Sequence, residues 1–130
     1  MGRLLLPHDA SSSATARRAI SADLSSARVC EERIFDAVLV AAELLGNAVA
    51  HAQPLDDGAV RITWAVQDGR ARIEVHDGGA ATRPHLRAAG PSDSDGRGLA
   101  IVAALADGWG YDASDGRCVV WAEFDAPIHS

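Results

Sequence analysis

The stretch "CEERIFDAVLVAAELLGNAVAHA" (residues 30–52) is the most strongly periodic segment of the chain. Apolar residues recur in it at intervals of three and four, which predicts a helix over about residues 31–52 with one buried stripe. The stripe comprises Ile34, Ala37, Val38, Ala41, Leu44, Leu45 and Ala48. Three polar residues interrupt the apolar run at four-residue spacing and therefore form one slanting row on the helix: Glu43, Asn47 and His51.

This polar row has two interpretations. Polar residues four apart are typical of the solvated face of any amphipathic helix. However, Asn is a modest helix former, and Asn47 stands in a run of Ala, Leu and Val. Its amide oxygen is a hard, neutral ligand that suits Mg²⁺ shared with substrate phosphates. Spacing alone does not decide between a solvated face and a binding site.

The flanking sequence predicts the other elements. Residues 4–6 are either an edge strand or a loose leader, and serines precede a helix at about 12–27. Alternating residues around Asp68–Gly69 predict a hairpin over 59–77, with Ile73 and Val75 facing inward. Residues 78–98 are rich in Gly and Pro, as in a functional loop or lid.

After this loop, "LAIVAALAD" predicts a short helix that starts just after Gly98 and is closed by Gly108. A second hairpin follows around Asp115–Gly116, for which we expect Val119, Trp121 and Phe124 to pack into the core. Helices and strand pairs are segregated along the chain. This order predicts an α+β two-layer sandwich, a mostly antiparallel sheet covered on one face by about three helices. The uncovered face must be solvated or used by a partner.

Composition limits the class of protein. A chain of 130 residues fits one domain spanning 1–130. The net charge of −6 argues against direct nucleic-acid binding. Cys30 and Cys118 lack metal-ligand spacing, and we expect two buried or partly buried thiols in a reducing compartment. The apolar run near the N-terminus has only three consecutive leucines, at residues 4–6, and is too short for a signal or membrane segment. We therefore expect a cytoplasmic protein with no membrane partner.

Two further motifs carry chemistry. In "EVHDGG" (74–79), Asp77 ends an expected strand, where a carboxylate can accept a hydrogen bond from a planar heterocycle. The alternative is a simple Asp-Gly turn. In "DGRGLAIVAAL" (95–105), Gly96 and Gly98 precede a helix start, where backbone N–H groups bind phosphate. The alternative there is a flexible loop end.

Taken in order, the three motifs resemble those of the GHKL superfamily of ATP-binding domains, named for gyrase, Hsp90, histidine kinase and MutL. That family has a helix with a Glu/Asn motif, then Asp-x-Gly after a strand, a mobile lid, and Gly-x-Gly before a helix. The segments "AAELLGNAVAHA" and "GRGLAIVAALADGWG" look most like the small stand-alone anti-sigma-factor serine/threonine kinases of actinobacteria. The resemblance covers about residues 10–125.

The resemblance implies a role for each matching residue. Asn47 would ligate Mg²⁺ bridging the ATP phosphates, and Asp77 would accept from the adenine amine, with Gly79 letting the nucleotide approach the backbone. Residues 80–95 would form the lid, and Glu43 would be the general base that takes the proton of a partner's serine hydroxyl. His51 would contact phosphate or cap its helix; neither is favoured. The third motif would bind the phosphates together with the start of the following helix. Its residues are Gly96, Arg97, Gly98 and Leu99.

The chain departs from the family pattern at two places. Ala81 stands where many members have a glycine, and Cys118–Val119 stands where relatives often carry a Thr that supports the adenine-bound water. The resemblance therefore implies a reduced affinity for ATP.

Three functions remain open. The first is a serine/threonine kinase that acts on an anti-sigma-antagonist protein and sequesters a sigma factor. The second is a binding module that regulates a partner by docking alone. The third, an ATP hydrolase of the gyrase or Hsp90 kind, needs transducer domains that are not in this sequence. A homodimer is plausible for this family, through the exposed sheet face or the first helix.

Overall fold

Five antiparallel strands form one sheet in the computed structural model, which describes residues 2–79, 94–114 and 116–128. Their order across the sheet is β1-β2-β3-β5-β4. The segment at residues 4–6 belongs to the first strand, in which Leu4 pairs with Ile62 and Leu6 with Val60. This strand is an edge strand, because it stands at one end of the order. The strands are β1 (Gly2–Pro7), β2 (Ala59–Gln67), β3 (Arg70–Asp77), β4 (Gly108–Ser114) and β5 (Arg117–Asp125).

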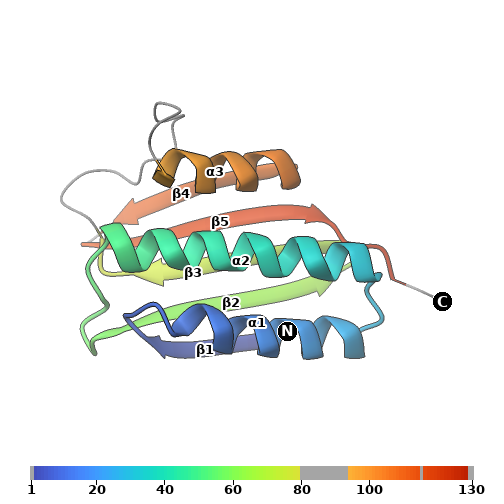
Figure 1. Cartoon of the computed structure of the whole chain (residues 1–130), viewed down its shortest axis with the longest axis horizontal. Coiled ribbons are helices and arrows are strands. Elements are labelled where there is room, and N and C mark those ends of the chain that lie inside the picture. Colours follow the sequence, from blue (N-terminus) through green and yellow to red (C-terminus); the bar gives the residue numbers. More distant parts are fainter. Residues whose placement is uncertain (1, 80–93, 115, 129–130) are drawn as a thin grey trace.

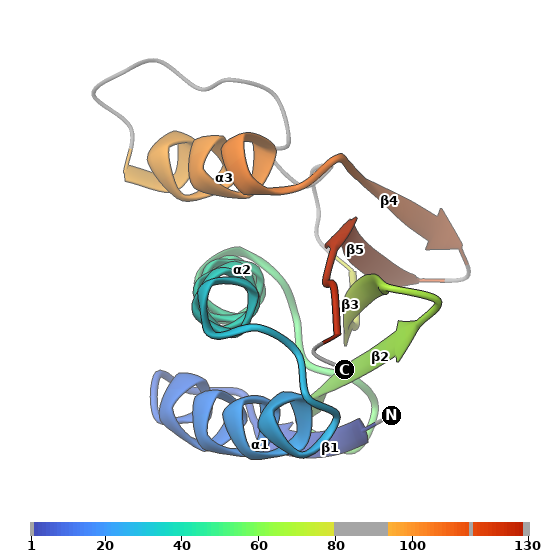
Figure 2. The ribbon, with the colours of Figure 1, turned by 90° about the vertical axis from the view of Figure 1, so that its right-hand side faces the viewer.

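Three helices cover one face of this sheet, as Figures 1 and 2 show. They are α1 (Ser12–Ser26), α2 (Glu31–His51) and α3 (Ser94–Leu105). The helix α2 lies in the middle of the layer, with α1 on one side and α3 on the other (Figure 1). The predicted α+β fold, an antiparallel sheet with helices on one face, is confirmed.

The core lies between the two layers. Alternate residues of β3 point toward the helices, and Ile73 and Val75 are fully buried there as predicted. The stripe of α2 meets them with Ala37, Ala41 and Leu44, each at most 1% exposed. Full burial of one Val, Leu or Ile side chain stabilises a fold by roughly 1.5–3 kcal/mol. The apolar residues therefore recur with a period of 3.6 in the helix and 2 in the strand because each set forms the face that packs against the other layer.

The start of α3 differs from the prediction. The helix begins at Ser94, so Gly96 and Gly98 lie inside its first turns, and Gly108 begins β4 instead of closing the helix. Each glycine costs a helix only about 1 kcal/mol relative to Ala. Packing decides such cases, and α3 buries Val102 completely against the core.

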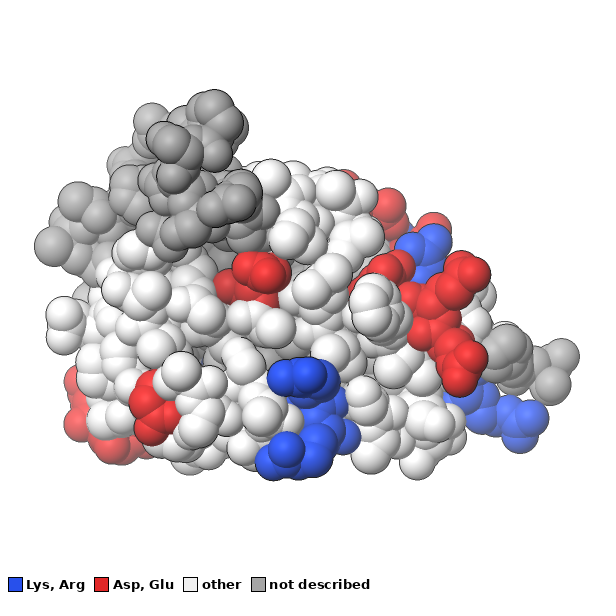
Figure 3. Space-filling model, in the orientation of Figure 1, with Lys and Arg blue, Asp and Glu red and all other residues white. Residues whose placement is uncertain are grey.

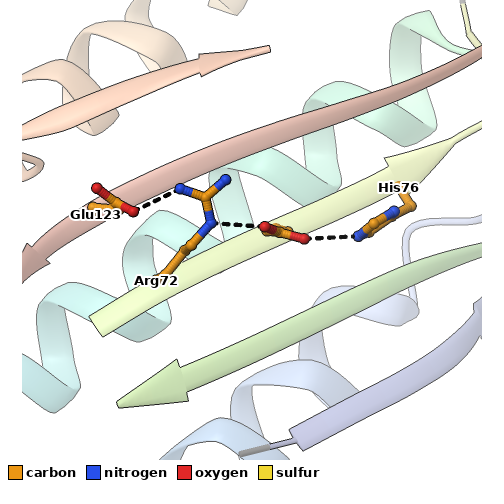
Figure 4. Close-up of polar contacts among 4 residues, drawn as sticks. Arg72, His76 and Glu123 are labelled. Carbon is orange, nitrogen blue, oxygen red and sulfur yellow. Dashed lines mark hydrogen bonds and ion pairs between the residues drawn. The ribbon is translucent and has the colours of Figure 1, made fainter. Parts of the chain in front are cut away.

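The face of the sheet away from the helices is polar and internally paired. Arg72 donates to Glu74 at 2.7 Å and to Glu123 at 2.6 Å, and His76 lies 3.1 Å from Glu74 (Figure 4). The Arg72 guanidinium also lies 4.6 Å from the ring centroid of Trp121. Burial lowers the pKa of Arg72, but its hydrogen bonds to the two glutamates outweigh this and raise it.

This arrangement corrects part of the predicted core. Phe124 is buried as expected, but Val119 and Trp121 are only half-buried and lie on the polar face. Successive residues of a strand face opposite sides, so Val119 and Trp121 cannot share a face with Phe124. The residues of β5 that face the core are Cys118, Val120, Ala122 and Phe124.

By length and composition alone, α2 could cross a membrane. The central helix of a soluble protein passes the same test, and α2 packs along the sheet. This is weak evidence and does not indicate a membrane protein.

Candidate functional site

Asp77 is the last residue of β3 and is only 3% exposed. Burial raises the pKa of its carboxyl, while the Gly79 N–H and the nearby His8 act in the opposite direction. The Gly79 N–H donates to Oδ1 at 2.7 Å. No hydrogen bond from the described residues reaches Oδ2. Asp77 is therefore a buried carboxylate with one oxygen fixed by the backbone and the other available to a donor.

The loop after Asp77 is joined to the end of α2 by its backbone. The Gln53 N–H donates to the Gly79 carbonyl, and the Gly78 N–H donates to the Gln53 carbonyl, both at 2.8 Å. A Cβ at Gly78 would lie 2.0 Å from the Pro54 carbonyl oxygen. The Asp77 loop and the residues that follow α2 therefore hold each other in place.

Gly79 has a structural role of its own. Its φ is +86°, which side chains rarely allow, and a Cβ there would lie 2.8 Å from the Gly116 carbonyl oxygen. The turn between β4 and β5 thus requires a glycine at this position whether or not a ligand binds. The nucleotide contact inferred for Gly79 stays a prediction.

The polar row of α2 lies at the same end of the molecule. Glu43 and Asn47 are half-buried, and His51 is exposed at the end of the helix. The C-terminal end of α2, the end of β3 and the start of α3 all lie at the left of Figure 1. Three segments far apart in the sequence, which carry the three motifs, are therefore brought to one end of the fold.

His8 is a residue of this region that the sequence did not reveal. Its Nε2 lies 3.1 Å from the Ala48 carbonyl oxygen and 2.9 Å from that of Ala52. Both are acceptors, so Nε2 carries the proton and donates to the end of α2. His8 thus caps this helix, a role that we had considered for His51. Because His8 lies 40 and 44 residues before the carbonyls that it contacts, no local sequence pattern indicates this contact.

The third motif is placed only in part. Gly96, Arg97, Gly98 and Leu99 belong to the first turns of α3, and the structure describes their backbone alone. The first four N–H groups of a helix have no partner within it, so a phosphate can bind at the start of α3. Because α3 begins at Ser94, Gly98 and Leu99 lie beyond these four groups. Residues 80–93 of the predicted lid, including Ala81, lie outside the described residues.

Cys118 lies opposite Asp77 in the pairing of β3 and β5. It is 2% exposed, and burial, followed by the charges of Asp77 and Asp112, raises its thiol pKa to about 11. The thiol therefore stays protonated at neutral pH. The expectation of buried or partly buried thiols is confirmed, since Cys30 is half-buried and both are free. Of the two positions where relatives carry Thr, only Cys118 faces the helix layer with Asp77.

A cleft of about 610 Å³ reaches Asp77 from the side of the polar sheet face. Its lining includes Asp77 and Gly78 together with Arg61, His76 and Arg117. Burial, and then the charge of Arg61, lowers the pKa of His76. Neither Glu43 nor Asn47 lines this cleft. The placement of Asp77 beside the end of α2 is therefore stronger evidence for the predicted site than this cleft is.

The model of the histidine kinase-like ATPase domain matches residues 6–124 of the chain. The chain belongs to this family. The GHKL resemblance is thereby confirmed, and membership implies ATP binding.

Solved structures support the fold. Over 97% of its length the chain matches the RsbU and RsbW domains of Rv1364c from Mycobacterium tuberculosis, with a TM-score of 0.73 and 21% identity. It also matches the histidine kinase AdeS of Acinetobacter baumannii, with a TM-score of 0.54 and 15% identity over 97% of the chain. The chain spans 33% of the first structure and 68% of the second. No curated protein matches it.

Proposed function

We propose that this ATPase-family domain binds Mg-ATP between the end of α2, Asp77 and the start of α3. The observation that carries the proposal is the buried Asp77, whose Oδ2 accepts no hydrogen bond from the described residues. A carboxylate in this state fits the exocyclic amine of adenine, which donates. In the proposal, the phosphates bind the backbone at the start of α3. Of the predicted third motif, Gly96, Arg97, Gly98 and Leu99, the last two residues lie beyond the first four N–H groups of the helix.

The chemistry of the donor set also fits magnesium. Among the described residues, no group of three His, Cys, Asp or Glu side chains could hold a metal ion without other ligands. Mg²⁺ commonly keeps waters and binds through one or two protein oxygens plus substrate phosphates. The Asn47 amide oxygen would be such a ligand, and the ion would neutralise charge on the transferring phosphoryl group.

We further propose that the domain is a serine/threonine protein kinase of the anti-sigma-factor type, acting on an antagonist protein in the cytoplasm. Glu43 takes the proton of a serine hydroxyl on that protein as the oxygen attacks the γ-phosphorus. The bond between the γ-phosphorus and the bridging oxygen breaks, and ADP leaves. Glu43 lies one turn before Asn47 on the same helix, which places base and metal ligand on one row.

A docking module without catalysis is the second candidate. Within the described residues, no hydrogen bond or ion pair orients the Glu43 carboxylate. A general base is normally oriented by a partner group, so this observation favours a role in which Glu43 performs no chemistry. In either case a sigma factor is the proposed second partner, and a homodimer remains a prediction.

Calorimetric titration with Mg-ATP tests the first step. We expect the wild-type domain to release binding heat and Asp77→Asn to weaken binding by about 10- to 100-fold, as for a lost hydrogen bond to a charged group. Asn47→Ala should weaken Mg-ATP binding but leave binding of ATP in EDTA unchanged. Gln67→Ala, at the exposed end of β2, is the matched control. Equal affinities for the wild type and Asp77→Asn would refute the nucleotide site.

Phosphate transfer separates the two candidates. The domain and a candidate antagonist protein are incubated with Mg-ATP, and phosphoserine is measured by mass spectrometry. The kinase predicts a product that is lost in Glu43→Gln while ATP affinity is retained. Antagonist binding without any phosphoserine would support the docking module instead.

A further inference from the structure

The outer surface of the helix layer carries an apolar groove between α1 and α2. Its volume is about 950 Å³, and residues of both helices line it. The two helices lie side by side on one side of the sheet (Figure 2). Phe35 forms part of its wall and is 68% exposed, more than any other large apolar side chain that the structure describes. The lining residues are Arg17, Ser21, Ser25, Glu31, Glu32, Ile34, Phe35, Val38, Leu39 and Ala42.

This groove exists because α2 is apolar on its outward side as well as its inward side. Phe35, Leu39 and Ala42 are spaced four and three apart and so form a second stripe, opposite the buried one. A helix that covers a sheet normally presents charged or polar residues outward. Apolar surface rimmed by charged residues is a feature of protein interaction sites.

The rim is acidic at one end and basic at the other. Glu31 and Glu32 are exposed at the start of α2, whereas Arg17 is exposed on α1. Because α1 and α2 run in opposite directions (Figure 1), the first half of α1, which carries Arg17, lies beside the later part of α2. Figure 3 shows acidic atoms where α2 begins, basic atoms over α1, and uncharged surface between them. Within the described residues, none of these three charges forms an ion pair.

We propose that this groove binds one amphipathic helix of a partner protein, with acidic residues in its first turn and basic residues in its last. The basic end lies over Glu31 and Glu32 and the acidic end over Arg17, so the helix runs antiparallel to α2. This charge order also suits the dipole of the bound helix. Its apolar stripe fills the groove beside Phe35, as in other helix-in-groove complexes.

A second copy of the chain fits this groove less well. Each of its helices already buries one side in its own core: Ile20 in α1, Leu44 in α2 and Val102 in α3 are at most 1% exposed. Among the side chains described on its helices, Phe35 is the one large apolar residue that is exposed, so a helix of a second copy would present the same groove, face to face. A separate helix, about 10–12 Å wide, can lie between two parallel rods and contact both.

A pair of synthetic peptides tests the proposal without nucleotide, so its failure is distinguishable from failure of ATP binding. Both are capped Ala-rich helices of about 15 residues with the same leucine stripe. One has Glu in its first turn and Lys in its last; the other has these charges exchanged. Fluorescence anisotropy at low salt should show that the first peptide binds about threefold or more tightly than the second.

Three variants make the test specific. Phe35→Asp should weaken binding of the first peptide tenfold or more, while Leu5→Asp, at an apolar residue 53% exposed on β1, should leave it unchanged. Replacing Glu31 and Glu32 together by Lys should remove the preference between the peptides. Circular dichroism checks that each variant is folded. Equal binding of both peptides by the wild type overturns the proposal, as does unchanged binding to Phe35→Asp. A dimer in sedimentation that Phe35→Asp dissociates overturns it in favour of a second copy.

Discussion

At the residue scale, Asp77 combines a proposed functional role with a cost to stability. Burial raises its pKa, so folding disfavours the charged carboxylate. The direction of the pH dependence follows from the two pKa values of Asp77: the carboxyl ionises at a lower pH in the unfolded chain than in the folded chain. Stability therefore falls as pH rises from the unfolded pKa through the folded one. We expect Asp77→Asn to raise the melting temperature of the nucleotide-free domain at pH 7.

Thermal denaturation across pH 3–8 checks this expectation. The gap between Asp77→Asn and the wild type should be small at acidic pH, open as Asp77 ionises and then stay constant. The same variant should bind ATP about 10- to 100-fold more weakly than the wild type. Because Oδ1 accepts from Gly79, the new amide places its NH₂ at the Oδ2 position, where it faces the adenine amine, another donor. A variant less stable than the wild type at every pH would contradict this account.

His8 gives the second prediction at this scale. His8→Ala removes the donor to the Ala48 and Ala52 carbonyls. We expect a loss of about 1 kcal/mol, the usual net value of such a bond. Urea denaturation measures the change, and Gln67→Ala, at the exposed end of β2, is the control. If the two variants lose the same stability, His8 has no special role in capping α2.

At the element scale, the junction between α2 and the Asp77 loop depends on Gly78. In Gly78→Ala the new Cβ must displace the Pro54 carbonyl, 2.0 Å away, and break the paired backbone bonds of Gln53. We expect a loss of about 1–3 kcal/mol, as for overpacking, and weaker ATP binding. Gly46→Ala is the matched control, because no atom of the described residues lies within 4 Å of its Cβ position on α2. It should stabilise the domain by about 0.5–1 kcal/mol in urea denaturation. If the two substitutions changed stability by the same amount, a side chain at position 78 would not strain the junction.

The elements themselves could be predicted where one pattern dominated. The bounds of α2 and of the first hairpin follow from clear periods of 3.6 and 2 in the apolar residues. In β5 both alternating sets contain apolar residues, Val120 and Phe124 in one and Val119 and Trp121 in the other. The choice of face then depends on the register with β3, which pairs Val120 with Val75 and is not local.

At the scale of the whole molecule, the order of helices, strands and motifs was enough to predict the fold, and it predicts that the three motifs form one site. The contacts that position the site could not be predicted in this way. His8, which follows β1, contacts the end of α2, and Gly79, which follows β3, approaches Gly116 in the turn between β4 and β5. Such contacts join residues distant in the chain, so they appear only once the layers are packed. The groove beside Phe35 is similar, since its second wall is supplied by α1.

Ligand binding should stabilise the whole domain, because only the folded chain brings α2, Asp77 and α3 together. With Mg-ATP at a hundred times its dissociation constant, the expected gain is about 2.7 kcal/mol. For a domain of 130 residues this corresponds to roughly 10 °C in melting temperature.

Differential scanning fluorimetry should show this shift in the wild type and in Gly46→Ala. Asp77→Asn should start from a higher melting temperature at pH 7 yet shift by only about 2–5 °C, as a 10- to 100-fold weaker affinity implies. In EDTA, Asn47→Ala should shift as the wild type does, since its proposed contact to the nucleotide is through the metal. A full shift in Asp77→Asn would mean that ATP stabilises the domain from another site.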